Sequence, residues 1–453
     1  MRSWQLNNLS ITTTPGPTTT PPPTTTPGPT TSGPTTTSGP TTTPGPTTTP
    51  GPTTTPGPTT TIKLWSKLGM DIPGVSLTES ERNSGRYEEE SGTCISLSAD
   101  GSRIAIGAPR NLNNRGVTRI YEFSEGRWTQ LGKDISGLTA SEQSGYSVSL
   151  SENGLKVAIG APFNPDLYGD YKGITRVYEL SGGQWTQLGW DIGGRSGERS
   201  GNSVSLSADG SKVAIGAFNN GAKRGMTRIY QLSDRGSWKQ FGRDIPGVAD
   251  GEQSGYSVSL SSDGLRVAIG APGDFGYSRG ITRIYDYQFL EDDWTQLGGD
   301  IIGGTDKESS GYSVSLSTNG SRVAIGAPRY SEWPSLDRGM TRVYQLSTDI
   351  WTQLGGNIPG KVGGENSGWS VSLSADGNWI AVGAPKKSDN KGITRVYQLS
   401  ENKWTQFGGD ITGGANLEEC GYSVSITHRY IARLAIGAPG SSNRKGITRI
   451  YNF

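Results

Sequence analysis

The residues that most often perform acid–base or nucleophilic chemistry are scarce and scattered in this chain. Its 453 residues include one histidine, His428, and two cysteines. No Gly-x-Ser-x-Gly, phosphate-loop or Cys-x-x-Cys motif is present, and no pair of carboxylates stands out among the 41 acidic residues. We therefore expect no enzyme and no cofactor beyond covalently attached glycans.

Glutamate recurs two residues before each Ser-Gly or Cys-Gly pair that opens a Tyr-Ser-Val-Ser-Leu-like segment. The positions are Glu89, Glu142, Glu198, Glu252, Glu308, Glu365 and Glu418. Seven carboxylates at one level can ring a channel mouth and hold a cation. The alternative, which we favour, is that each Glu caps its own turn or meets a neighbouring repeat.

Two further charges recur with the same spacing. An arginine lies in each Thr-Arg-x-Tyr segment, at Arg119, Arg176, Arg228, Arg283, Arg342, Arg395 and Arg449. An acid lies in each Trp-containing segment, at Asp71, Asp134, Asp191, Asp244, Asp300 and Asp410, with Asn357 in the remaining copy. We expect these groups to pair within each repeat and to specify register, because an exposed pair contributes only about 0 to 1 kcal/mol.

These charges belong to a unit that occurs seven times. Each copy contains a Gly-Tyr-Ser-Val-Ser-Leu strand, a turn, Val-Ala-Ile-Gly-Ala-Pro, a variable loop, Gly-Ile-Thr-Arg-Ile-Tyr and Trp-Thr-Gln-Leu-Gly-Gly-Asp-Ile. Alternation of period two and many β-branched and aromatic residues predict strands, and no stretch predicts a helix. The copies are about 55 residues apart, which suits a four-stranded propeller blade.

The copies are out of phase with the chain ends. The last copy stops at Tyr451 after its third strand, and a lone fourth-strand segment from Trp65 to Ile72 precedes the first copy. We therefore predict an all-β, seven-bladed β-propeller of four-stranded antiparallel blades, closed when Trp65 to Ile72 joins the last blade. The Ser-rich strand should be innermost and the Trp strand outermost.

The turn between the first and second strands is Asp-Gly or Asn-Gly in six copies, which predicts tight hairpins. The seventh copy, at residues 427–432, lacks Gly, and we expect a distorted or longer hairpin there.

Cys94 and Cys420 fall in the first and last complete copies, which the predicted ring makes neighbours. Each replaces a serine of the repeat. Two interpretations remain open. The cysteines form a disulfide across the seam, which indicates an oxidising compartment, or they are two buried thiols.

The repeat resembles the FG-GAP repeats found in the propeller heads of integrin α chains. The match comprises Gly145-Tyr146-Ser-Val-Ser-Leu through Val157-Ala-Ile-Gly-Ala-Pro162 and its equivalents, from about residue 63 to the C-terminus. This resemblance implies the propeller fold, whereas members of the family serve adhesion, ligand binding and scaffolding alike.

The FG-GAP family often carries a calcium loop with closely spaced aspartates, which suit a hard cation. The loops of this chain are mostly basic or neutral, and only Asp166, Asp170 and Asp274 offer such ligands. We expect no calcium site, and these three residues are the only candidates.

Residues 12–61 consist mainly of near-repeats of Thr-Thr-Thr-Pro-Gly-Pro. Proline at this density favours an extended polyproline II segment, at about 3.1 Å per residue. The composition is typical of O-glycosylated mucin-like or cell-wall stalks, with a naked linker as the alternative and with hydroxylated proline as another possible glycan carrier. The O-glycosylation candidates are Thr12, Thr13, Thr14, Thr18, Thr19, Thr20, Thr24, Thr25, Thr26, Thr41, Thr42, Thr43, Thr47, Thr48, Thr49, Thr53, Thr54 and Thr55.

Residues 1–11 place four apolar side chains in a polar segment, which is either a docking strand or a disordered start. Asn8 and Asn319 lie in Asn-x-Ser sequons and are N-glycosylation candidates.

Departures from the repeat point to a binding surface, because the blade itself does not require them. Tyr168, Tyr171 and Trp333 lie in the two long loops, and exposed aromatic rings stack on sugars and anchor protein contacts. Trp369 and Trp379 also depart from the repeat, but they occupy strand positions and we expect them in the core.

The net charge of +1, with acids and bases interspersed, favours neither nucleic acid nor an anionic membrane surface. No segment is apolar enough to span a membrane, and the first residues lack a signal-peptide core. From the stalk we expect an extracellular or cell-surface structural glycoprotein. Its propeller, at residues 62–453, would assemble with identical subunits into a fibril, surface hair or wall layer. The alternative is a stalked adhesion or carbohydrate-binding module.

Overall fold

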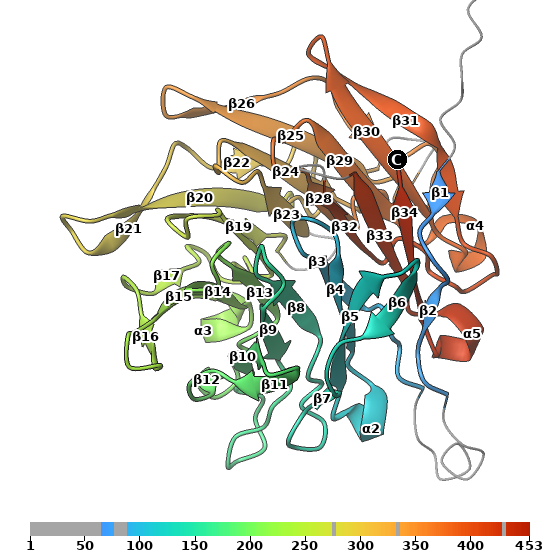
Figure 1. Ribbon diagram of the computed structural model, residues 1–453. Helices are drawn as coiled ribbons and strands as arrows, with labels where there is room; N and C mark the ends of the chain where they lie inside the picture. Colours follow the sequence, from blue (N-terminus) through green and yellow to red (C-terminus); the bar gives the residue numbers. More distant parts are fainter. Residues whose placement is uncertain (1–64, 77–87, 274–277, 332–335, 428–431) are drawn as a thin grey trace, which may run out of the picture. The chain divides into compact units, whose positions relative to one another are not determined.

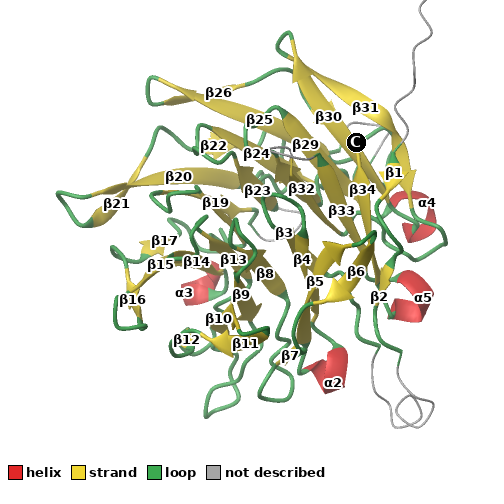
Figure 2. Cartoon of the chain, in the orientation of Figure 1, coloured by secondary structure: helices red, strands yellow, loops and turns green. Residues whose placement is uncertain are grey.

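The computed structural model describes residues 65–76, 88–273, 278–331, 336–427 and 432–453 (Figure 1). The chain divides into two units, Met1–Thr60 and Thr61–Phe453, and all described residues belong to the second. The predicted docking strand, the Thr/Pro stalk with its threonines, and Asn8 therefore lie outside the described residues. The second unit is a ring of seven antiparallel sheets, an all-β seven-bladed propeller (Figure 2).

Each blade has four principal strands, and the first strands of adjacent blades contact one another around the axis. The first strands are β3 (Cys94–Leu97), β8 (Ser147–Leu150), β13 (Ser203–Leu206), β18 (Ser257–Leu260), β23 (Ser313–Leu316), β28 (Ser370–Leu373) and β32 (Ser423–Thr427). The second strands are β4 (Arg103–Ala108), β9 (Lys156–Ala161), β14 (Lys212–Ala217), β19 (Arg266–Ala271), β24 (Arg322–Ala327), β29 (Trp379–Ala384) and β33 (Arg433–Ala438).

The outer half of each blade has a long third strand and a Trp-containing fourth strand. The third strands are β5 (Val117–Ser124), β10 (Ile174–Ser181), β15 (Met226–Leu232), β20 (Ile281–Gln288), β25 (Met340–Ser347), β30 (Ile393–Ser400) and β34 (Ile447–Asn452). The fourth strands are β6 (Arg127–Gln130), β11 (Gln184–Gln187), β16 (Trp238–Gln240), β21 (Asp293–Gln296), β26 (Ile350–Gln353), β31 (Lys403–Thr412) and β1 (Ser66–Lys67). Two-residue strands also pair with six of the third strands, namely β7 (Ile135–Ser136), β12 (Ile192–Gly193), β17 (Ile245–Pro246), β22 (Ile301–Ile302), β27 (Ile358–Pro359) and β2 (Ile72–Pro73).

The ring closes as the sequence predicts. β1 and β2 pair antiparallel with β34, with Ser66 opposite Asn452 and Ile72 opposite Thr448. The segment predicted as one strand from Trp65 to Ile72 is thus two short strands, and it completes the last blade. The inner position of the Ser-rich strand and the outer position of the Trp strand are also confirmed.

The core lies between the blades. The second strands are buried along nearly their whole length, because other blades cover both of their faces. One cluster joins Ala105 and Ile120 of the first blade to Val148 and Ile159 of the second, and the other interfaces repeat this arrangement. Burial of these apolar side chains is the main stabilising term of such a ring.

Short loops depart from the strand pattern. The part of the chain that the structure describes contains four single-turn helices between second and third strands, whereas the sequence predicted none; they are α2 (Asn111–Asn114), α3 (Asn220–Lys223), α4 (Lys387–Asn390) and α5 (Ser441–Arg444). Residues with positive φ lie within or at the end of these turns, which prevents their continuation into longer helices.

The six Asp-Gly or Asn-Gly hairpins form, with glycine φ between 64° and 69°. Most of the seventh hairpin, residues 428–431, lies outside the described residues. No described helix has both the length and the apolar character needed to cross a membrane.

Candidate ligand-binding site

Two cavities lie at opposite ends of the innermost strands. The hairpin-end cavity, of about 250 Å³, is lined by residues at the C-terminal ends of these strands, such as Leu97 and Leu150. The aromatic cavity, of about 260 Å³, is lined by residues at the N-terminal ends, such as Thr93 and Tyr146. The same strands therefore present two chemically different surfaces along one axis.

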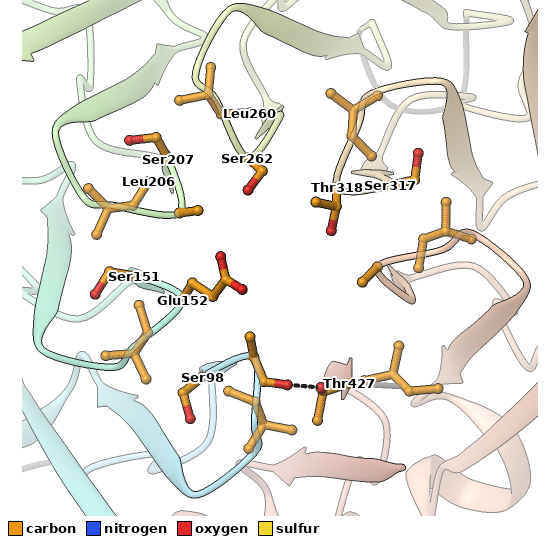
Figure 3. Close-up of a pocket in the computed structure, with 18 residues that line it drawn as sticks. Ser98, Ser151, Glu152, Leu206, Ser207, Leu260, Ser262, Ser317, Thr318 and Thr427 are labelled. Carbon is orange, nitrogen blue, oxygen red and sulfur yellow. Dashed lines mark hydrogen bonds between the residues drawn. The ribbon is translucent and has the colours of Figure 1, made fainter. Parts of the chain in front are cut away.

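Backbone hydrogen bonds connect the blades around the hairpin-end cavity. Ala99 N donates to Glu152 O at 2.9 Å, Glu152 N donates to Ala208 O at 2.8 Å, and the pattern continues through Ser262 and Thr318. The hydroxyl of Thr427 donates to Ala99 O and links the last blade to the first (Figure 3). Figure 3 also shows the Glu152 side chain extending toward the centre of the opening, between leucine and serine side chains. The peptide groups at this end thus serve to hold the ring together.

An aromatic collar surrounds the other cavity. It consists of the residue that precedes each innermost strand by one position, which is aromatic in five blades. The collar residues are Tyr146, Tyr256, Tyr312, Trp369 and Tyr422, with Thr93 and Asn202 at the two remaining positions. The rings of four successive blades touch, with centroid separations of 5.0 Å for Tyr256–Tyr312, 4.8 Å for Tyr312–Trp369 and 5.6 Å for Trp369–Tyr422. These four residues form a continuous aromatic wall on one side of the cavity.

The collar tyrosines remain protonated. Burial raises the pKa of Tyr312 well above its usual value, and it also raises the pKa of Tyr146, Tyr256 and Tyr422. Their phenols therefore act as neutral hydroxyl groups at any physiological pH.

The charged groups of the rim outside the collar lie over aromatic rings or pair with groups of opposite charge. On one side the Arg199 guanidinium lies over the rings of Phe163, at 5.2 Å, and Phe218, at 5.7 Å. At the seam, Glu90 pairs with Arg444 at 2.5 Å, and burial raises the pKa of Glu90 although Arg110 and Arg444 oppose that shift. Arg110 and Arg444 thus compensate the charge of the Glu90 carboxylate at the seam between the first and last blades.

The seven repeated glutamates do not surround either opening. Each is buried and accepts a hydrogen bond from a backbone N–H group of the turn before it, so the favoured interpretation that it caps its own turn is confirmed. Each also pairs with the arginine of the same repeat, which was not predicted from the sequence. The pairs are Glu89–Arg119, Glu142–Arg176, Glu198–Arg228, Glu252–Arg283, Glu308–Arg342, Glu365–Arg395 and Glu418–Arg449. Glu142 also accepts hydrogen bonds from the N–H groups of Leu138 and Thr139 and so caps its own turn.

The predicted Arg–Asp pairing within blades is also confirmed. The Arg176 Nε lies 3.0 Å from a carboxylate oxygen of Asp191, and Arg228 makes the same contact with Asp244 at 3.0 Å. The side-chain amide of Gln187 donates to Asp191 at 2.8 Å. In five blades a glutamine four residues before the aspartate thus fixes the carboxylate, which holds the arginine in place for the buried glutamate.

Of the loop aromatic residues that the sequence singled out, Tyr171 contacts the surroundings of the collar, whereas Tyr168 is exposed. Tyr168 is 92% exposed. Tyr171 packs edge-on against Phe163 with centroids 5.4 Å apart, and Phe163 meets Tyr146 of the collar at 5.9 Å. Tyr171 therefore extends the aromatic surface outward from the cavity, whereas Trp333 and His428 lie outside the described residues.

The two unusual tryptophans have different surroundings. Trp379 is buried in the core, as predicted. Trp369 is only half-buried and lines the aromatic cavity, so its assignment to the core was wrong. The tyrosine of the repeated Gly-Tyr pair was the sequence signal for this collar, but it was interpreted only as a strand residue.

Two of the three weak calcium candidates are described, and both carboxylates already accept hydrogen bonds from the protein. A carboxylate oxygen of Asp166 accepts from the N–H groups of Tyr168, at 2.8 Å, and Asp170, at 3.0 Å. Asp170 accepts from the Ser196 hydroxyl at 3.1 Å. Asp274 lies outside the described residues, among which no group of three His, Cys, Asp or Glu is placed to bind a metal.

The candidate sequon at Asn319 lies in an exposed hairpin turn. The side-chain oxygen of Asn319 accepts from Ser321 N at 3.0 Å and from the Ser321 hydroxyl at 2.8 Å.

Both cysteines considered as disulfide partners from the sequence are free thiols in the structure. The Cys94 sulfur faces the second blade, where it accepts a hydrogen bond from Val148 N at 3.3 Å, and so points away from the blade that contains Cys420. Burial raises the pKa of Cys94 to about 11 and that of Cys420 to about 12. The structure therefore has two free thiols, of which Cys420 is buried and Cys94 is half-buried.

Comparisons with known proteins support the fold alone. No protein-family model matches the chain, and no curated protein matches it. Among solved structures, a chain of the hydrazine synthase of Kuenenia stuttgartiensis is similar, with a TM-score of 0.54 and 11% identity. The match covers 81% of this chain and 97% of that chain. At this level of identity the similarity indicates a shared architecture and carries no argument about activity.

Proposed function

We propose that this protein is a non-enzymatic extracellular structural glycoprotein, in which a rigid propeller is carried by a glycosylated Thr/Pro stalk. Identical subunits assemble into a fibril, surface hair or wall layer. We also propose that the repeat is an FG-GAP repeat, because the Gly-Tyr-Ser-Val-Ser-Leu and Val-Ala-Ile-Gly-Ala-Pro segments occupy the first two strands of the blades.

The observation that carries this proposal is the repeated bonding between blades. In every blade a serine hydroxyl of the innermost strand accepts a hydrogen bond from the next blade's strand, for example from Leu150 N to Ser96 Oγ at 3.0 Å and from Leu316 N to Ser259 Oγ at 2.9 Å. The serines that accept the same hydrogen bond in the other blades are Ser149, Ser205, Ser315, Ser372 and Ser425. The repeated arginine, glutamate and aspartate side chains likewise pair with one another inside the propeller. Such internal bonding suits a mechanically stable subunit.

Exposed apolar side chains give such a subunit surfaces for contact. Trp190 is 85% exposed, Leu167 is 99% exposed and Leu290 is 98% exposed. Single exposed apolar residues are common, so they support assembly only together with a direct observation of it.

The test is electron microscopy of the natively secreted, glycosylated protein, with sedimentation velocity on the same sample. We expect filaments or sheets in which propellers repeat at a constant spacing. Dispersed single propellers at all concentrations would contradict the structural function.

A second candidate function is that of a stalked adhesion or carbohydrate-binding module. The aromatic collar favours it, because a concave surface that combines several aromatic rings with uncharged polar side chains is a common form of a small-molecule site. A glycan array probed with the full-length protein would test this function, and a protein that binds no glycan would contradict it.

A further inference from the structure

We propose that the aromatic cavity binds one neutral sugar ring, stacked on the wall formed by Tyr256, Tyr312, Trp369 and Tyr422. This inference rests on the second candidate function and assigns its site. It requires no assembly of subunits, and so it is independent of the structural function.

The wall offers an apolar face of suitable shape. Its tyrosine and tryptophan rings come from four successive blades and are inclined to one another by 43° to 51°. They are half-buried, which leaves one side of each residue accessible from the cavity. The C–H face of a pyranose or furanose ring is apolar and packs on such rings, and aromatic side chains provide a large contact area with little loss of conformational entropy.

The opposite side of the cavity is polar. There the collar is interrupted by Thr93 and Asn202, while Tyr146 stands between them in chain order. The Asn202 amide donates to Tyr256 O at 2.9 Å, which fixes its orientation. A ligand with one apolar face and hydroxyl groups on its edge matches this division between an aromatic wall and a polar side.

The lining of the cavity is uncharged. Its residues are Thr, Cys, Ile, Tyr, Ser, Val, Asn and Trp, without any Asp, Glu, Lys, Arg or His. The tyrosines stay neutral, and the charged groups of the rim have partners of their own: Lys386 pairs with Glu419 and also lies over the Trp369 ring, 5.8 Å from its centroid, and Arg199 lies over the Phe163 ring. A buried charge without a partner is strongly unfavourable, so the lining selects a neutral ligand over a phosphate, a carboxylate or an amine.

The size of the cavity, and its position inside a ring of seven innermost strands, select a single sugar ring. Its volume of about 260 Å³ lies below the roughly 300 to 1,000 Å³ of drug-sized pockets. Its lining comes from the start of the innermost strands of all seven blades, so the cavity is surrounded on every side by the blades and is not an elongated groove. An extended peptide needs a groove open along its length, so a monosaccharide or the terminal sugar of a glycan fits better than a polyproline chain.

The hairpin-end cavity provides an internal comparison. It has nearly the same volume, about 250 Å³, but it is lined by Leu, Ile, Ser, Ala, Thr and Glu152, with no aromatic residue among those described. Stacking on a sugar is therefore confined to the aromatic end of the axis.

The test measures binding of D-glucose, D-galactose, D-mannose and L-arabinose to the full-length protein by saturation-transfer NMR and calorimetry. Glucuronic acid, glucosamine and a Thr-Thr-Thr-Pro-Gly-Pro peptide serve as charged and peptide probes. The variants are Trp369→Ala, which removes the centre of the wall, and Thr93→Trp, which fills the cavity without removing a wall contact. Trp190→Ala is the control, because Trp190 is 85% exposed and does not line the cavity. Melting temperature and circular dichroism establish that each variant is folded.

We expect at least one neutral sugar to bind, with affinity at least tenfold weaker in Trp369→Ala and Thr93→Trp and unchanged in Trp190→Ala. Sugar binding that persists in both folded collar variants would overturn the assigned site and leave a carbohydrate-binding function standing. Binding of only the charged sugars or only the peptide would overturn the proposal that the ligand is a neutral sugar. Failure of the wild-type protein to bind any sugar, on this panel and on a glycan array, would overturn both the site and the second candidate function.

Discussion

Trp128 donates a hydrogen bond from its indole N–H to the carbonyl oxygen of Leu68 at 3.0 Å, across the seam between the first and last blades. The same bond joins five of the six other pairs of adjacent blades, in which the acceptor is Leu or Phe and the distance is 2.8 to 3.0 Å; the pairs are Trp185–Leu131, Trp238–Leu188, Trp294–Phe241, Trp351–Leu297 and Trp404–Leu354. Trp65 differs, since it donates to Gly409 O at 3.2 Å on the bulged strand β31. The seam is thus bonded like an ordinary interface.

The replacement Trp128→Phe should therefore cost as much stability as Trp351→Phe at an interior interface. Each variant loses one indole hydrogen bond, worth about 1 kcal/mol, and part of the packing of a large ring. Urea titrations of both variants, followed by circular dichroism, measure the free energy of unfolding. A much larger loss for Trp128→Phe would show that the seam is the weak point of the ring.

The buried pair of Glu365 and Arg395 should be far more important for stability than an exposed pair. Glu365 is 0% exposed and Arg395 is 2% exposed at the side chain, and they approach to 2.6 Å. Glu365→Gln leaves a buried guanidinium without its main carboxylate, which should lower the free energy of unfolding by about 3 to 5 kcal/mol.

The matched control for this variant is Glu122→Gln. Glu122 pairs with Arg103 at 2.8 Å, but its side chain is 35% exposed. Loss of this pair in Glu122→Gln should lower the free energy of unfolding by only about 0 to 1 kcal/mol. Equal effects of the two substitutions on urea unfolding would contradict the structural role assigned to the buried glutamates.

The same network predicts loss of stability in acid. Burial tends to raise the pKa of Glu142 and Glu198, but hydrogen bonds from Arg176 and Arg228 and from neighbouring groups hold both pKa values below the usual 4.5. A carboxyl group whose pKa is lower in the folded state contributes stability that is complete above its unfolded pKa and is lost as the pH falls. The melting temperature should be nearly constant from pH 7 to about pH 5 and should fall below about pH 4.5. A melting temperature that stays constant down to pH 3 would contradict this prediction.

The strand order and ring closure could be predicted because they depend on the repeat, and a repeat shows both its period and its phase relative to the chain ends. The directions in which single side chains near the axis point could not be predicted in this way. Tyr146 and its equivalents immediately precede the innermost strand, and period-two alternation does not indicate which side chains face the axis and which face the next blade. Trp369 was assigned to the core and Cys94 was considered as a disulfide partner for the same reason.

The glycine of the repeated Gly-Ala pair should tolerate no side chain, because neighbouring blades meet there. A Cβ atom on Gly326 would lie 2.1 Å from the carbonyl oxygen of Gly368 in the next blade. The equivalent distances at Gly107 and Gly160 are 2.0 and 2.1 Å. Gly326→Ala must push two blades apart, and we expect it to lower the free energy of unfolding by at least about 1 to 3 kcal/mol, the cost typical of overpacking.

A suitable control for Gly326→Ala is Gly299→Ala, since a Cβ atom there would meet no described atom within 4 Å. Both variants are compared by thermal and urea unfolding. If Gly326→Ala were as stable as Gly299→Ala, close approach of the blades would not be what the repeated glycine provides.

Cys94→Ser should restore a hydrogen bond that the repeat makes elsewhere. Ser147, at the equivalent position, donates its hydroxyl to Gly201 O of the following blade at 2.9 Å, and Ser257 donates to Gly311 O at 2.9 Å. The corresponding acceptor for residue 94 is Gly145 O. A serine can make this bond where the thiol makes only weak contacts with Val148, so the variant should be at least as stable as the wild type, with a gain of up to about 1 kcal/mol.

Thiol labelling provides the independent check on this cysteine. Because burial raises the pKa of the Cys94 thiol to about 11 and that of Cys420 to about 12, neither should react with a disulfide reagent in the native protein at pH 8, and both should react in urea without prior reduction. Cys94→Ser should then release one thiol per chain on unfolding instead of two. A requirement for reduction before labelling would mean that the two sulfurs are bonded after all. A Cys94→Ser variant less stable than the wild type would show that the packing of the thiol, and not the repeated hydrogen bond, determines the stability of this position.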